Sequence, residues 1–212
     1  MDGLSPGVKV CGRSRATSSG TLIRNTLTGE QRVTLANHGW ETNETLVFHP
    51  DRPNEIGTLT DRMPGYDVAL CQLNSGLSYT NAKYFSAPEP THFISSKDFE
   101  DHVSPLSYFA ADGFTTGVVW FEAVGIITHG GVDMAVLSTR HAHILRISRA
   151  SQSESQGNTD PKDGICRSPM VHQEDEDPVL DRGCIGFFSA WDGTNAGVPT
   201  SDHLIFNGWY VA

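Results

Sequence analysis

Short runs of apolar and β-branched residues recur along the chain, and each run is bounded by Gly, Pro, Asn or Asp. In the first third, such runs occupy residues 20–23, 32–36, 45–48 and 68–73. Runs of this length and composition, flanked by turn-forming residues, are typical of β-strands. We therefore predict that this part of the chain is a set of short strands joined by tight turns.

A second group of strands follows a mixed, polar segment. Residues 74–105 show no regular alternation, and we interpret them as a connection between two groups of strands. Further strands are predicted at residues 115–127, 134–138, 143–147, 184–191 and 203–211, and an exposed loop is predicted at residues 149–162. The 3.6-residue pattern predicts no amphipathic helix longer than about three turns. Two groups of strands divided by a connector indicate two packed barrels or sandwiches.

Composition and charge narrow the classes of function. The chain has 212 residues, of which 38% are apolar and 19% are charged, as in ordinary globular proteins. The net charge is −10 and no Lys/Arg cluster is present, so no nucleic-acid partner is expected. No run approaches the roughly 18 apolar residues of a membrane span, so no membrane partner is expected either. Residues 1–21 lack the apolar core of a signal peptide, which favours a cytoplasmic location.

The four cysteines match no motif for zinc or redox chemistry. Cys11, Cys71, Cys166 and Cys184 are compatible in number with two disulfides. Each lies in or beside an apolar stretch, where free cysteine commonly packs as a small hydrophobic residue, and reduced thiols are therefore favoured. Neither a metal site nor a cofactor is expected from the sequence.

Three residues with catalytic side chains lie at the edges of predicted strands or in a tight turn. His38 ends one strand, Asp67 opens another, and Cys166 lies in a Gly-x-Cys-x-x-Pro turn between Gly164 and Pro169. Taken singly, such residues are usually structural. Their order gives them weight, because a His, an Asp and a nucleophile followed by an apolar strand is the order of one known type of catalytic triad.

Four segments of the chain resemble, in order, segments of the trypsin/chymotrypsin superfamily. They are SGTLIRN with RVTLANHGW, YDVALCQL, GFTTGVV, and DGICRSPMV with GCIGFFSAW, and together they span roughly residues 19–191. They are similar to the family's paired strands ending in Ala-x-His, its Asp-Ile-Ala-Leu strand, the strand-leading Gly-x-x-Thr-Gly of compact members, and its Gly-Asp-Ser-Gly-Gly-Pro turn with the following strand. The resemblance implies an all-β fold of two six-stranded antiparallel β-barrels. Residues 1–85 would form the barrel with His38 and Asp67, and residues 86–212 the barrel with Cys166.

The resemblance also implies a role for each site residue. His38 would be the general base, Asp67 would orient it, and Cys166 would be the nucleophile where most relatives have Ser. The backbone N–H groups of Gly164 and Cys166 would form the oxyanion hole. The positions implied in substrate binding are Asp160, Ser189, Ala190 and Trp191. The implied activity is that of a monomeric cysteine endopeptidase acting on a polypeptide through a Cys166 thioester, without a cofactor.

The chain departs from the family pattern beside the nucleophile, which leaves alternatives open. Arg167 replaces a glycine, so its side chain would crowd the substrate or its backbone would need a conformation that glycine adopts most easily. Ile165 replaces the usual Asp, and Trp191 stands where a glycine often keeps the pocket open. Ser168 is the rival nucleophile. The alternative functions are an inactive pseudo-peptidase that binds proteins and an unrelated β-sandwich binding protein in which His38 and Cys166 never meet.

Overall fold

β-strands make up most of the secondary structure of the chain. The computed structural model describes residues 3–82, 84, 87–102, 107–133, 138–149, 165–173, 176–191 and 195–212. Helices within these ranges are short: α1 (Ser96–His102), α3 (Asp202–Phe206) and the 3₁₀ turns η1 (Asn37–Gly39) and η2 (Pro64–Tyr66). No helix in the described part of the chain is long and apolar enough to span a membrane.

The first sheet contains the N-terminal strands and the last strand of the chain. Within the described residues its order is β16-β3-β4-β7-β6-β5-β1-β2, and all neighbours pair antiparallel. These strands are β1 (Lys9–Cys11), β2 (Ala16–Ser18), β3 (Leu22–Asn25), β4 (Gln31–Ala36), β5 (Leu46–Phe48), β6 (Glu55–Met63), β7 (Val68–Leu73) and β16 (Trp209–Val211).

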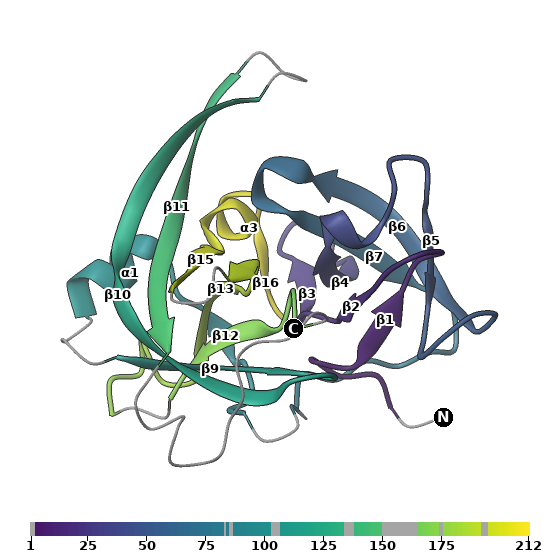
Figure 1. The fold of residues 1–212 in the computed structure, drawn as a ribbon, viewed down its shortest axis with the longest axis horizontal. Coiled ribbons are helices and arrows are strands. Elements are labelled where there is room, and N and C mark those ends of the chain that lie inside the picture. The colour runs from purple at the N-terminus through teal and green to yellow at the C-terminus, as the bar shows by residue number, and fades with distance from the viewer. Residues whose placement is uncertain are drawn as a thin grey trace.

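The second sheet follows in the chain and includes a long hairpin. Its order in the described ranges is β14-β15-β11-β10-β9-β12-β13-β8. These strands are β8 (His92–Phe93), β9 (Tyr108–Gly113), β10 (Gly117–Asp133), β11 (Ser138–Arg149), β12 (Pro169–His172), β13 (Gly183–Phe187), β14 (Ala190–Trp191) and β15 (Asn195–Pro199). Figure 1 shows the two sheets side by side, with the β10–β11 hairpin projecting beyond both of them.

The sheets differ from the predicted barrels in their strand counts. Each sheet contains eight described strands, so two six-stranded barrels are not confirmed. The very short strands β8 and β14 add to the second sheet, and β16 adds the C-terminus of the chain to the first. The division at residues 85 and 86 stays a prediction.

Individual strand predictions have mixed outcomes. The range 68–73 coincides with β7, and the range 32–36 lies within β4. The single strand predicted at 203–211 is wrong, because its first residues belong to α3 and only its last ones to β16. Leu204 and Ile205 donate their backbone N–H groups to the carbonyl of Ser201, which starts the helix. The predicted residues 134–137 and 150–162 lie outside the described ranges.

Each sheet has its own apolar cluster, and a further cluster joins the two sheets. The joining cluster consists of Ile23, Val68 and Leu70 from the first sheet, Cys184 and Phe187 from the second sheet, and Leu204 from α3. All six side chains are buried, so the two sheets pack through a continuous apolar contact. The predicted catalytic residues come from both sides of this contact.

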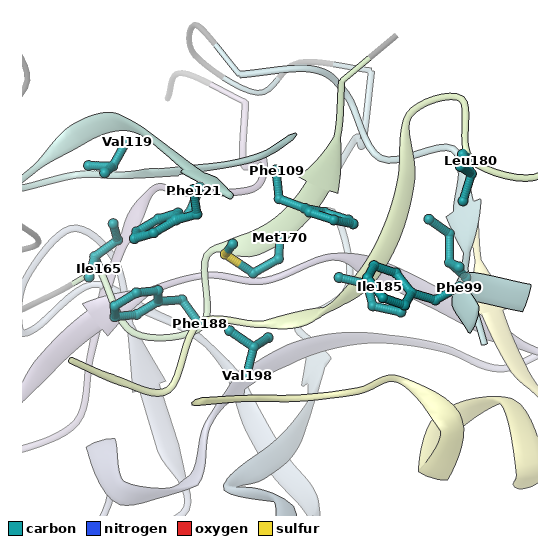
Figure 2. Packing of buried hydrophobic residues seen from close by; sticks show 12 residues of the cluster. Phe99, Phe109, Val119, Phe121, Ile165, Met170, Leu180, Ile185, Phe188 and Val198 are labelled. Atoms are coloured by element: carbon teal, nitrogen blue, oxygen red, sulfur yellow. The ribbon is translucent and has the colours of Figure 1, made fainter. Parts of the chain in front are cut away.

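The residue before Cys166 is part of the core of the second sheet. Ile165 is buried in a cluster with Phe121, Met170 and Phe188, and Figure 2 shows its side chain close to the rings of Phe121 and Phe188. The two rings are 5.6 Å apart between centroids. An Ile at this position therefore anchors the turn that contains Cys166 by burying apolar surface.

Tyr84 connects the segment between the sheets to the second sheet. Its buried hydroxyl donates to the Pro169 carbonyl at 3.1 Å and accepts the Asp112 N–H at 2.6 Å. Both partners lie on strands, because Asp112 belongs to β9 and Pro169 begins β12.

We predict that Tyr84→Phe destabilises the protein by about 1–3 kcal/mol, since the loss of one hydroxyl removes two buried hydrogen bonds. For a chain of this size, Tm falls by roughly 2–4 °C per kcal/mol. Thermal unfolding of the variant provides the measurement. The matched control is Tyr210→Phe, which removes the hydroxyl of an exposed tyrosine. Equal Tm values for Tyr84→Phe and the wild type would contradict the prediction.

Candidate active site

His38 and Asp67 are brought together by the register of the first sheet. β4 and β7 pair antiparallel, and Ala36 at the end of β4 lies opposite Val68 at the start of β7. Asn37 and Asp67 come next to this pair, just beyond the two strands. They are joined by a hydrogen bond from the Asn37 N–H to the Asp67 carbonyl at 2.9 Å. His38 follows directly in the 3₁₀ turn η1, so its side chain leaves the chain beside Asp67.

The Asp67 carboxylate holds His38 at two points. Oδ1 accepts the backbone N–H of His38 at 2.9 Å, and Oδ2 contacts the ring Nδ1 at 2.7 Å. The Asp67 backbone is left-handed, with φ 54° and ψ 30°, at the end of η2. Asp is among the few residues other than glycine that adopt this conformation readily. Because two bonds fix the carboxylate on the histidine, the imidazole has a defined orientation.

The turn that contains His38 is held by Arg62 on β6. The Arg62 Nε donates to the Asn37 Oδ1 at 2.7 Å. The terminal nitrogens of Arg62 donate at 2.7–3.1 Å to four backbone carbonyls, those of Asn37, Trp40, Glu41 and Thr42. The planar guanidinium has enough donors to satisfy all of these acceptors at once. Sequence reasoning did not identify Arg62, because nothing in the local pattern indicates which loop a strand arginine will reach.

The turn around Cys166 is attached to both sheets. The backbone carbonyl of Cys166 accepts the Ser18 N–H at 3.2 Å and the Thr17 hydroxyl at 2.5 Å, and both of these partners belong to β2. On the other side, the Arg167 N–H donates to the Phe188 carbonyl at 2.8 Å. Cys166 is therefore held at the contact between the sheets.

The Cys166 sulfur lies next to the imidazole and is partly exposed. Hydrogen bonding with Asp67 and then with Cys166 raises the pKa of His38 from 6.5 to about 9, against the opposing effect of burial. The sulfur also contacts the Ser189 carbonyl at 3.4 Å. All four cysteines are free thiols, and Cys166 is more exposed than the other three. The structure thus brings together all three residues of the predicted triad.

The pKa of Asp67 lies below its ordinary value. Burial opposes the charged carboxylate, but the hydrogen bond from His38 and the charge of Arg167 outweigh that effect. The Ser189 hydroxyl adds a long contact of 3.5 Å to Oδ2. Ser189 was predicted as a substrate-binding residue, and the structure adds that its side chain contacts the Asp67 carboxylate.

The crowding expected from Arg167 is wrong. Its side chain is fully buried, and Nη2 donates to the Tyr66 carbonyl at 2.5 Å, behind Asp67. The backbone of Arg167 has φ 74°, which is the conformation that favours glycine. The second expectation for this position, a special backbone dihedral, is therefore confirmed.

Ser168 is not available as a nucleophile. The residue is fully buried, and its hydroxyl donates to the Asp112 carbonyl at 2.8 Å. Gly113, next to Asp112, lets the turn of Ser168 lie close to the end of β9. A Cβ on Gly113 would lie 3.1 Å from the Ile165 Cα and 3.0 Å from the Ser168 side-chain oxygen.

The remaining predicted positions are only partly described. Ala190 and Trp191 form β14, which pairs with β15. Gly164 and Asp160 lie outside the described residues, so their roles stay predictions. Within the described ranges, no three His, Cys, Asp or Glu residues are arranged to hold a metal ion.

The raised pKa of His38 predicts a pH-dependent contribution to stability. A raised pKa stabilises the fold fully below the unfolded value of 6.5, and this contribution is lost as the pH rises through about 9. We expect the difference in Tm between the wild type and His38→Gln to be largest below pH 6.5 and to shrink toward pH 9. Thermal unfolding of both proteins across this range tests the prediction. A Tm difference that stays constant over the range would contradict it.

We predict that Arg62→Met slows alkylation of Cys166 by iodoacetamide about tenfold or more, because small displacements in a catalytic arrangement are costly. The variant removes all the bonds that Arg62 makes to residues 37–42, although Arg62 is not adjacent to the sulfur. Arg24→Met, which changes an exposed arginine on β3, is the matched control. An alkylation rate in Arg62→Met equal to that of the control would show that Arg62 does not position His38.

Comparisons with known proteins agree with this architecture. No protein-family model and no curated protein sequence matches the chain. The structure of protease A from Thermobifida fusca is similar with a TM-score of 0.63 and 14% identity, covering 99% of this chain and 98% of that one. An alpha-lytic protease homolog, N4, has a TM-score of 0.59 and 13% identity over 99% and 100% of the two chains.

The Rv3671c protease in its inactive form is also similar. Its TM-score is 0.55 at 14% identity, over 95% of this chain and 87% of that chain. At such low identities the likeness concerns the fold. The chain therefore has the all-β, chymotrypsin-like fold of these proteases over almost its whole length.

Proposed function

We propose that the protein is a cysteine endopeptidase of chymotrypsin-like fold, with Cys166 as nucleophile, His38 as its acid–base partner and Asp67 as the residue that orients His38. The observation that carries the proposal is the imidazole of His38, which is bonded to Asp67 at 2.7 Å and has the Cys166 sulfur beside it. The protease fold of the similar structures supports the same class of reaction.

The charge of His38 favours cysteine chemistry over serine chemistry. With a pKa raised to about 9 by Asp67 and Cys166, the imidazole is protonated at neutral pH. A protonated imidazole cannot remove a proton from a serine hydroxyl, but it is the ordinary partner of a nucleophilic thiolate. The proposal therefore assigns the resting state to a pair of Cys166 thiolate and His38 imidazolium.

Acylation begins from this ion pair. The Cys166 thiolate attacks the carbonyl carbon of the scissile peptide bond, a C–S bond forms, and the carbonyl electrons move to the oxygen. The resulting oxyanion is proposed to bind the N–H groups of Cys166 and Gly164, and each such donor contributes about 3 kcal/mol. The Cys166 N–H donates to no acceptor in the described part of the chain, which fits this role. The C–N bond then breaks, and His38 gives its Nε2 proton to the leaving amine.

Deacylation uses the same histidine as a base. Neutral His38 takes a proton from water, and the hydroxide attacks the thioester carbonyl. The C–S bond breaks, the carboxylic acid leaves, and the thiolate–imidazolium pair is restored. Asp67 stays ionised throughout and stabilises the charged imidazole, as its lowered pKa allows.

The substrate of the proposed enzyme is a polypeptide, and the enzyme is proposed to be a monomer. We further propose that the segment from Ser189 to Trp191 lines the bound peptide. The support is that Ser189 borders the sulfur through its carbonyl. Asp160 is proposed as an acidic specificity residue, which would favour Lys or Arg in the substrate.

Selective alkylation of Cys166 tests the proposal. We expect iodoacetamide to label Cys166 rapidly at about pH 6.5, where ordinary thiols react slowly. The other thiols are buried, and burial raises the pKa of Cys71 and of Cys184 to about 12. His38→Gln should slow labelling by about 100-fold or more, while Cys166→Ser should abolish both labelling and hydrolysis of a peptide library.

The outcomes separate the proposed enzyme from its alternative. Rapid, His38-dependent labelling together with cleavage of library peptides supports the endopeptidase. Rapid labelling without cleavage of any peptide would favour a pseudo-peptidase that binds proteins. Equally slow labelling of all four cysteines would overturn the assignment of Cys166 as nucleophile.

A further inference from the structure

Arg167 is the fully buried, positively charged residue immediately after Cys166. A guanidinium without water is costly unless a negative charge and hydrogen-bond acceptors surround it. Nη2 donates to the Tyr66 carbonyl at 2.5 Å, while Nε and Nη1 have no partner among the described residues. The side chain must therefore gain most of its compensation from the charges around it.

The nearest opposite charge is the carboxylate of the proposed triad. Nη2 lies 3.9 Å from Asp67 Oδ2, the oxygen that contacts the His38 ring at 2.7 Å. The guanidinium also stands over the ring of Phe187 at 5.5 Å from its centroid, which closes the apolar side of its environment. The low dielectric of such a site strengthens the attraction between Arg167 and Asp67.

We propose that Arg167 is a positioning residue, a buried counter-ion that keeps the Asp67 carboxylate ionised and directed at His38. Its consequence for catalysis rests on the proposed function, whereas the charge pairing itself does not. The backbone supports this role, since with φ 74° at Arg167 the guanidinium reaches the Tyr66 carbonyl and lies beside the Asp67 carboxylate.

The charges of the surrounding elements are consistent with this assignment. The titratable groups coupled to Arg167 are Asp67 at the end of η2, Cys166 in the same turn and His203 on α3. Asp67 is in turn hydrogen-bonded to His38. With the thiolate–imidazolium pair formed, Asp67 and Cys166 are negative while His38 and Arg167 are positive. The cluster then carries no net charge, which reduces the cost of burying it.

His203 does not compete with Arg167 for Asp67. Its ring stacks on Tyr66 with centroids 4.3 Å apart, and its Nδ1 bonds the Thr200 carbonyl at 3.0 Å. Burial and then the charge of Arg167 lower the pKa of His203 to about 4, with the carboxylate of Asp202 as an opposing charge. His203 is therefore neutral at physiological pH and leaves Arg167 as the cation on this side of Asp67.

The experiment follows the low-field proton resonance of the His38 Nδ1–H group in NMR as the pH is lowered. This proton is hydrogen-bonded to the Asp67 carboxylate, so the loss of its resonance in acid reports protonation of that carboxylate. In Arg167→Met, which keeps the apolar stem, we expect the midpoint of this loss to lie about one pH unit or more above the wild-type midpoint. The matched control is Arg182→Met, because Arg182 also has a positive φ but is paired with Asp181.

A double-mutant cycle on Tm provides the second readout. Arg167→Met and Asp67→Asn each leave a buried charge without its partner, so the Tm loss of the double variant should be smaller than the sum of the single losses. Additive losses together with an unchanged acid midpoint would overturn the proposal. If the wild type hydrolyses no peptide, the endopeptidase fails, but the NMR midpoint and the Tm cycle still decide the role of Arg167.

Discussion

The pair of hydrogen bonds between Asp67 and His38 is the interaction on which the rest of the site depends. It exists because β4 and β7 are neighbours in register, so that their ends place the two residues side by side. The same carboxylate raises the pKa of His38 and thereby sets the charge beside the Cys166 sulfur. A protonated imidazole suits a thiolate, which is why we propose Cys166 as the nucleophile.

The contact between the two sheets supplies the other half of the site. The Cys166 carbonyl is hydrogen-bonded to β2, and Ile165 is buried in the core of the second sheet. The turn that contains both residues therefore has little conformational freedom. Arg167 then extends from the same turn to Tyr66 and Asp67 on the opposite side. One turn of the chain therefore contributes an apolar anchor, the proposed nucleophile and a counter-ion in three consecutive residues.

The sequence predicted the parts of this arrangement that depend on local pattern. Apolar runs gave β7 and most of β4, and residue order indicated that His38, Asp67 and Cys166 belong together. β6 was missed because its apolar residues are separated by Gly57 and by polar residues. α3 was taken for a strand because its apolar residues are consecutive. For Arg167 the sequence left crowding and a special backbone dihedral both open, since the buried partners that draw a charged side chain inward cannot be read from the local pattern.

Direct titration of the His38 imidazole by NMR, in the wild type, Asp67→Asn and Cys166→Ala, tests the central claim. We predict a wild-type pKa of His38 near 9 that falls in both variants, and falls further when Asp67 is replaced, because Asp67 is the larger cause. A wild-type pKa near the ordinary 6.5, unchanged in Cys166→Ala, would contradict it, because His38 would then be neutral and uncoupled from the sulfur.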